Sequence, residues 1–137
     1  MPANTLPIFT KIADVQWITG ASVNNTYDLT SGTIYLAFSA DSTNGGYIQR
    51  IRFKALGTTA ATVARVFINN GAATGTLTNN TLWDEISLPL VSASATAASA
   101  TYELPMNIPL PAGYRIYVVF GTAASAGWGI TVIGGKY

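Results

Sequence analysis

Cysteine and histidine are both absent from this sequence of 137 residues. Without cysteine the chain can form neither disulfides nor thiolate metal sites. Without histidine it lacks the commonest general base and the commonest metal ligand. The two absences weigh against an enzyme and against a metal centre. The sequence therefore predicts no catalytic residue, no metal ligand and no cofactor.

Charge is scarce as well. Charged residues make up 9% of the chain, whereas an average globular domain has roughly 25%. The formal net charge is only +1. A general nucleic-acid binder needs many cations to displace the counterions around the phosphates, so this composition argues against nucleic acid as a partner. A surface with so little charge can meet another protein, or a copy of itself, at a small desolvation cost.

Long apolar runs are also missing. No uninterrupted run approaches the roughly 20 residues that a membrane helix needs. The N-terminal segment has no apolar core of signal-peptide length, and Pro2 and Pro7 interrupt it. We therefore expect a chain that is made in a cytoplasm, is not exported by the usual route and has no membrane partner.

Side chains with a period of two dominate what is present, as in β-strands. Strands are predicted at residues 13–19, 32–40, 46–56, 62–70, 80–90, 100–108, 113–122 and 127–135, with a weaker candidate at 26–30. Turn-forming segments such as "DSTNGG" and "NNGAATG" separate them. Short strands punctuated in this way predict an all-β fold, a jelly-roll-like Greek-key β-sandwich of about eight strands.

Two segments fall outside the strand pattern. Residues 1–12 contain two prolines and no alternation, which predicts an extended N-terminal arm that could lie across a neighbouring subunit. Residues 92–101, rich in Ser, Ala and Thr, have no apolar stripe and are interpreted as a long loop or a loose edge strand. The remainder, residues 13–137, is predicted to be a single β-sandwich domain.

Three of the seven basic residues stand within five positions, in the segment "IQRIRFK". A period of two places Arg50, Arg52 and Lys54 on one face of a strand. One interpretation is a solvated face, or an edge strand guarded by charge. The other is a contact patch for an acidic protein surface, in which arginine supplies planar, bidentate pairing. Further candidates for the protein-binding surface, on later predicted strands, are Arg65 and Arg115.

The neighbours of these cations follow from the same alternation. It predicts that Ile48 shares the basic face, and that Tyr47 and Phe53 point to the opposite one. No aromatic ring would then be interleaved with the charges. The arrangement offers no stacking platform for bases, which again argues against nucleic acid.

Tryptophans and acids give weaker signals. Trp17, Trp83 and Trp128 could line a sugar-binding groove, but core and interface packing is the favoured interpretation because each ring buries a large area. Adjacent Asp84 and Glu85 face opposite sides of a strand, and so do not form a glycosidase pair by themselves.

Four blocks of the sequence resemble a group of small, cysteine-free proteins encoded among tailed-bacteriophage structural genes. The blocks are "DVQW" (14–17), "RIRFKALGTTAATVARVFINNG" (50–71), "LPMNIPLPAGYRIYV" (104–118) and "GWGITVIGGKY" (127–137). They are scattered along most of the chain and include no catalytic motif, so no residue role is carried over. The resemblance implies a virion component, and within that class a capsid decoration, or cement, protein.

Decoration proteins of this kind typically form trimers that sit where hexamers and pentamers of the capsid protein meet, and they fasten the shell. The resemblance therefore implies a homotrimer on the capsid exterior, with the major capsid protein as its partner. We expect Arg50, Arg52 and Lys54 to face the shell or a neighbouring subunit. The alternative is a head- or tail-fibre domain that binds host glycans.

Overall fold

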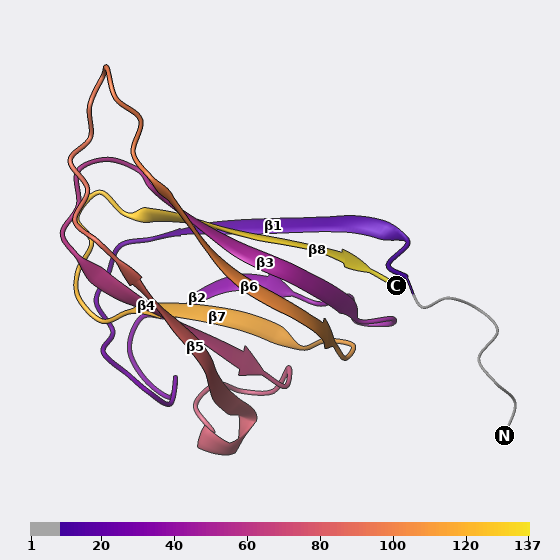
Figure 1. Ribbon diagram of the computed structural model, residues 1–137. Coiled ribbons are helices and arrows are strands. Elements are labelled where there is room, and N and C mark those ends of the chain that lie inside the picture. Colours follow the sequence, from indigo (N-terminus) through magenta and orange to yellow (C-terminus); the bar gives the residue numbers. More distant parts are fainter. Residues whose placement is uncertain (1–8) are drawn as a thin grey trace, which may run out of the picture.

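The fold is a sandwich of two antiparallel four-stranded sheets, seen in Figure 1. The computed structural model describes residues 9–137. The strands are β1 (Ile12–Gly20), β2 (Tyr35–Ser39), β3 (Gly46–Ala55), β4 (Thr62–Asn69), β5 (Asn80–Leu88), β6 (Thr101–Leu110), β7 (Arg115–Phe120) and β8 (Trp128–Lys136), and a short 3-10 helix, η1 (Leu77–Asn79), precedes β5.

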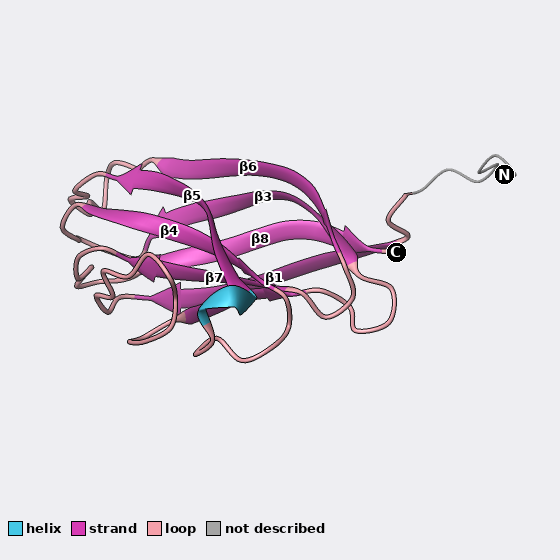
Figure 2. Cartoon of the chain, turned by 90° about the horizontal axis from the view of Figure 1, so that it is seen from below, coloured by secondary structure: helices cyan, strands magenta, loops and turns pink. Residues whose placement is uncertain are grey.

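The strand order identifies a jelly roll. One sheet has the order β1-β8-β3-β6 and the other has the order β2-β7-β4-β5. Every connection except that between β4 and β5 crosses from one sheet to the other, which is how two Greek keys form a jelly roll. Figure 2 shows these connections gathered at the two ends of the strands. The predicted all-β sandwich of about eight strands is confirmed.

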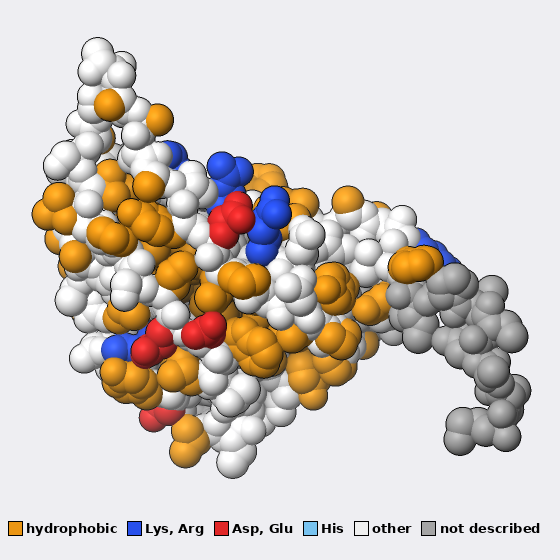
Figure 3. Space-filling view, in the orientation of Figure 1, with side chains coloured by type: hydrophobic (Ala, Val, Ile, Leu, Met, Phe, Trp, Pro, Cys, Tyr) orange, Lys and Arg blue, Asp and Glu red, His pale blue; other side chains and the backbone are white. Residues whose placement is uncertain are grey.

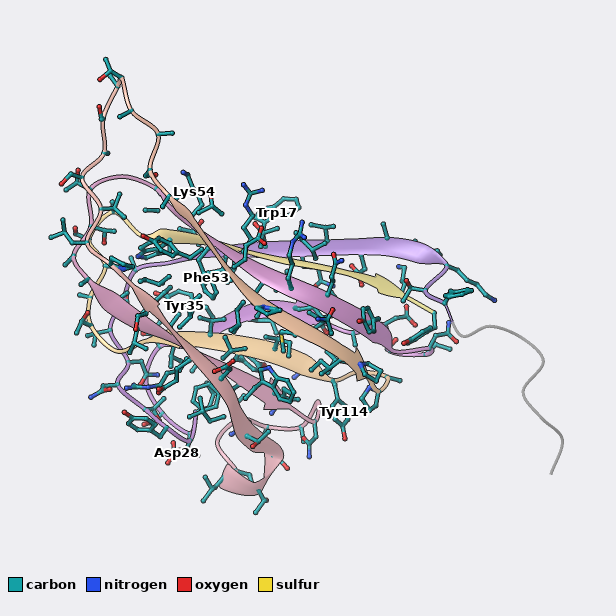
Figure 4. All side chains as sticks on the ribbon, viewed as in Figure 1. Trp17, Asp28, Tyr35, Phe53, Lys54 and Tyr114 are labelled. Atoms are coloured by element: carbon teal, nitrogen blue, oxygen red, sulfur yellow. The ribbon has the colours of Figure 1, made fainter. Side chains whose placement is uncertain are left out.

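The core lies between the two sheets and is built from the inward rows of every strand. In β8 the inward residues are Trp128, Ile130 and Val132, and all three are fully buried. In Figure 4, Phe53 of β3 and Tyr35 of β2 point into the same interior. The ring of Trp128 meets that of Tyr102 edge-on, with 5.9 Å between centroids. Burial of these large side chains provides the main driving force for the fold.

A β-bulge in β3 overturns part of the predicted alternation. The pairing of β3 shifts register between Ile48 and Arg50 against both of its neighbours, β6 and β8. An extra residue at this point lets Ile48 and Ile51 both point inward, where each is fully buried. The prediction that Ile48 shares the basic face was wrong. Tyr47 accordingly lies on the outer side, not beside Phe53.

The weaker strand candidate at residues 26–30 was also wrong. Residues 21–34, between β1 and β2, form a loop over the outer face of sheet β2-β7-β4-β5. Leu29 in this loop is buried against Phe67, Tyr117 and Val119, and the Asn80 side-chain amide donates a hydrogen bond to the carbonyl of Asp28. The chain thus covers one of its two outer sheet faces with its own loop.

The structure tests only in part the two segments that were predicted to lie outside the strand pattern. Of the predicted arm at residues 1–12, residues 1–8 lie outside the described residues, and Ile12 is already the first residue of β1. The Ser- and Ala-rich segment is a loop, as one of the two interpretations held: residues 89–100 connect β5 to β6 and project from one end of the sandwich in Figure 1.

We predict that Gly134→Ala destabilises the protein by about 1–3 kcal/mol, the usual range for overpacking. A Cβ at Gly134 would collide with the backbone carbonyl of Tyr47, beside the bulge in β3. The matched control is Gly129→Ala in the same strand, whose added Cβ would find Leu56 Cδ2 at an ordinary 3.5 Å. Urea denaturation of both variants measures the difference. Equal stability of the two would show that β8 has room at the bulge.

Candidate protein-binding surface

The outer face of sheet β1-β8-β3-β6, called the open face below, carries the basic residues of β3. Their cross-strand neighbours follow from the register. Arg52 lies between Glu103 of β6 and Thr131 of β8, and Thr131 in turn pairs with Trp17 of β1. In the adjacent row, Arg50 pairs with Ile133, which in turn pairs with Val15 of β1. Cations and exposed apolar side chains therefore share one continuous surface.

The three cations of the open face differ in their contacts. Arg50 Nε lies 3.6 Å from Glu103 Oε1. Lys54 Nζ donates a hydrogen bond to the carbonyl of Ser99 in the β5–β6 connection. Arg52 is exposed, and within residues 9–137 its side chain makes no ion pair or hydrogen bond. Figure 3 shows blue side chains gathered at the upper margin of the molecule around one acid. Arg52 is the cation best placed to bind a second molecule.

Trp17 extends the open face with a large apolar side chain. It is 74% exposed, whereas Trp128 is fully buried. Of the two packing roles expected for the tryptophans, the core role holds for Trp128. Trp17 and Trp83, the latter 42% exposed on β5, lie outside the core, and an interface role for them stays a prediction. In Figure 4, Trp17 and Lys54 lie on the same outer side of the sheet.

The outward direction of Trp17 is set by its neighbour Gln16. The Gln16 amide donates to the carbonyl of Ser39 and accepts from the Ser39 backbone N–H, each at 2.9 Å. These two bonds satisfy the backbone N–H and C=O of Ser39, the last residue of β2, and fix Gln16 on the inner side of β1. Strand alternation then places Trp17 outside. A polar residue that faces inward beside an apolar one that faces outward reverses the usual pattern of a strand. The exposure of Trp17 could therefore not be predicted from the alternation of β1.

Arg65, predicted to bind a partner, does not belong to the open face. It lies on β4 in the other sheet and is only 5% exposed. Its guanidinium donates to Glu85 Oε1 at 2.7 Å, Asn25 Oδ1 at 2.6 Å and the Tyr27 hydroxyl at 2.8 Å. It also lies 3.9 Å from the centroid of the Tyr27 ring. Its donors bind residues of the same chain and hold the 21–34 loop in place.

Arg115 is also separated from the cations of β3. It begins β7 in the other sheet, is half-buried and stands in register with Ser39 and Asn69. The fold therefore brings together three of the five predicted residues and places the other two on the opposite layer. Strand alternation alone does not reveal in which sheet a strand lies.

The acids of the turns have structural roles. A hydrogen bond from the Thr30 backbone, followed by those from the Thr26 and Thr30 hydroxyls, lowers the pKa of Asp28. Backbone N–H groups of Asn44 and Thr43 lower the pKa of Asp41 in the same way. Both carboxylates thus favour the ionised form and stabilise their own turns. Among residues 9–137, no three His, Cys, Asp or Glu side chains cluster as metal ligands would.

Comparisons with known proteins found no matching sequence and only weak similarity to a solved structure. No family model matches the sequence, and no curated protein matches it. Among solved structures, the chain is similar to one described as "Structure of infectious bursal disease virus Gx strain", with 15% identity and a TM-score of 0.32. The match covers 99% of this chain but 37% of that one. At that TM-score the likeness carries no argument about fold or function. Within residues 9–137, no helix is long and apolar enough to cross a membrane.

Proposed function

We propose that this protein is a structural component of a virus particle, a capsid decoration protein that binds the major capsid protein as an oligomer and stabilises the shell. Its place is the capsid exterior, and it performs no catalysis. The proposal combines the resemblance to small tailed-phage virion proteins with one feature of the structure, the open face.

The contrast between the two outer sheet faces carries the proposal. One face is covered by the 21–34 loop, which buries Leu29 against the sheet. The open face has no such cover among the described residues, and it presents Trp17 together with the cations of β3. Exposed aromatic and arginine side chains are the residue types that most often dominate protein–protein binding energy. An open face with this composition suits a protein partner.

The charges of the open face indicate the sign of the charge that its partner should carry. Arg50, Arg52 and Lys54 stand against a single carboxylate, Glu103, on the neighbouring strand. Like charges along one strand repel each other when they are unpaired. An acidic patch on the shell would relieve that repulsion and steer the docking. This supports a partner whose surface is acidic at the contact.

A second candidate is a fibre domain that binds host glycans. Trp17 favours it, because an exposed indole face can stack against the apolar face of a sugar, and Arg52 follows two strands away in the same row. A glycan array with Trp17→Ala as the control tests this role. Binding of a glycan class that Trp17→Ala abolishes, together with no binding to shells, would favour the fibre over the decoration protein.

We expect Arg52→Glu to weaken binding to capsid shells at least tenfold, since tenfold corresponds to about 1.4 kcal/mol and a reversed charge replaces attraction with repulsion. The measurement is co-sedimentation of purified protein with shells that lack it. The matched control is Arg115→Glu, which makes the same charge change on the opposite sheet and should bind as the wild type does.

Equal loss of binding in both Arg52→Glu and Arg115→Glu would show that net charge, and not the open face, governs docking. A wild-type protein that does not bind shells at all would overturn the proposed function.

A further inference from the structure

Four strand edges limit the two sheets: β1 and β6 in one, β2 and β5 in the other. An edge strand presents unpaired N–H and C=O groups that can pair with another chain. Proteins commonly guard such edges with prolines, bulges, charges or short strands. A long edge without guards therefore points to a partner strand.

Three of the four edges are guarded. Strand β6 carries Pro105 and Pro109, which remove ladder donors. Strand β5 shifts register around Trp83, and Asp84 and Glu85 follow directly. Strand β2 has only five residues and is itself irregular in its pairing with β7.

Strand β1 is the least guarded of the four edges, and its single charged residue is Asp14 on the inner side. Its nine residues pair with β8 without a register shift, from Ile12 opposite Lys136 to Gly20 opposite Trp128. It contains no proline, and in the described part of the chain no loop or side chain hydrogen-bonds to the backbone of residues 12–19. Figure 1 shows β1 along the margin of its sheet. Among residues 9–137, the outer edge of β1 is therefore free of hydrogen bonds along residues 12–19.

The side chains of β1 are also suited to contact with a copy of the chain. The outward row is uncharged and consists of Ala13, Val15, Trp17 and Thr19. Asp14, the single charged residue of the strand, is half-buried on the inner side and accepts a hydrogen bond from the Gln16 amide at 3.1 Å. Two copies could meet at this edge without burying a charge from the outward row.

We propose that β1 of one copy pairs antiparallel with β1 of a second copy, about a two-fold axis at Gln16. This register keeps both outward rows on one face of a continuous eight-stranded sheet. It places Val15 of each copy opposite Trp17 of the other, and Ala13 opposite Thr19. An aromatic side chain opposite a β-branched one is a favourable cross-strand pair.

This inference does not depend on the proposed function. The cations of β3 lie two strands in from β1, so the pairing leaves them free to face a shell. It joins copies two at a time, which gives a dimer, or a hexamer if the three-fold contacts implied by the phage resemblance also form. Failure to bind shells would leave the pairing intact, and loss of the pairing would not by itself remove the shell-binding face.

The absence of cysteine makes a direct test possible. Ala13→Cys and Thr19→Cys variants, mixed and mildly oxidised, should form a disulfide-linked pair, because directly opposite residues lie within disulfide reach. Neither variant alone should form a disulfide-linked pair, because in this register each position lies opposite the other and not opposite itself. Light scattering of the wild type should give an even multiple of the 14.4 kDa chain.

Trp17→Lys should convert these pairs to single chains, or the hexamer to trimers, because it places two cations beside the axis. Thr131→Lys, on the same face but one strand inward, should leave the pairs intact. A wild type that is monomeric or purely trimeric, or cross-linking that does not require the mixture, would overturn the proposal. Equal disruption by both lysine variants would assign the contact to the sheet face and not to the edge.

Discussion

Trp128→Ala should lower the free energy of unfolding by about 3–5 kcal/mol, the range for removal of a large buried aromatic side chain. Trp128 is fully buried in the core and packs edge-on against Tyr102. A domain of this size has a total stability of only about 5–15 kcal/mol. We therefore expect a variant that is largely unfolded at moderate temperature. Far-UV circular dichroism in urea measures the loss without relying on tryptophan fluorescence.

The control for Trp128→Ala is Trp17→Ala, the same substitution in the same sheet. Because Trp17 is 74% exposed, its removal should change stability by no more than about 0.5 kcal/mol, the usual limit for surface substitutions. The comparison is made at a concentration where the chains are separate. Comparable losses in the two variants would contradict the assignment of Trp128 to the core and Trp17 to the surface.

Arg65→Met should destabilise the protein by about 2–3 kcal/mol, because it removes charge-assisted hydrogen bonds worth roughly 1.5–3 kcal/mol each while keeping much of the side-chain volume. The expected loss of stability is smaller than the summed free energies of the Arg65 hydrogen bonds. The reason is that the Glu85 side chain is 41% exposed and can be hydrated once Arg65 is gone. Hydrogen exchange should rise in the 21–34 loop, which Arg65 holds through Asn25 and Tyr27.

Arg115→Met is the matched control for Arg65, since Arg115 lies in the same sheet and is half-buried. We expect it to cost less than about 1 kcal/mol and to leave loop exchange unchanged. If Arg65→Met kept full stability and instead lost binding to shells, the result would contradict the structural role of Arg65 and support its prediction as a partner residue.

The sequence predicted the strands well because most of them combine a period of two with flanking turn residues. The segments at 62–70 and 127–135, for example, match β4 and β8 to within one residue at each end. It failed at Ile48, because a bulge depends on the pairing of β3 with two other strands and leaves no mark in a single segment. Local pattern therefore gave the elements but not their irregularities.

Only part of the candidate site could be predicted, because the exposure of a residue in a strand depends on segments that lie far away in the sequence. Arg52 and Arg65 look alike in the sequence, since each stands within a predicted strand. One is exposed and the other is buried, because residues 21–34 fold over only one of the two sheets. The exposure of Trp17 likewise depends on bonds between Gln16 and Ser39, which lie 23 positions apart. Contacts between distant segments decide which members of a local pattern reach the surface.

The projecting β5–β6 connection can change in sequence and length without disturbing the fold. Its tip holds no part of the core. Among the described residues, the chain fastens the connection near its base, through a backbone pair between Thr59 and Val91, the bond from the Ala93 backbone N–H to the Thr58 hydroxyl and the bond from Lys54 to Ser99. Doubling the length of a flexible loop costs only about 0.6 kcal/mol. Related chains can therefore lengthen, shorten or rewrite residues 94–97 while the jelly roll beneath stays the same, and a foreign peptide spliced there would be displayed clear of both sheets.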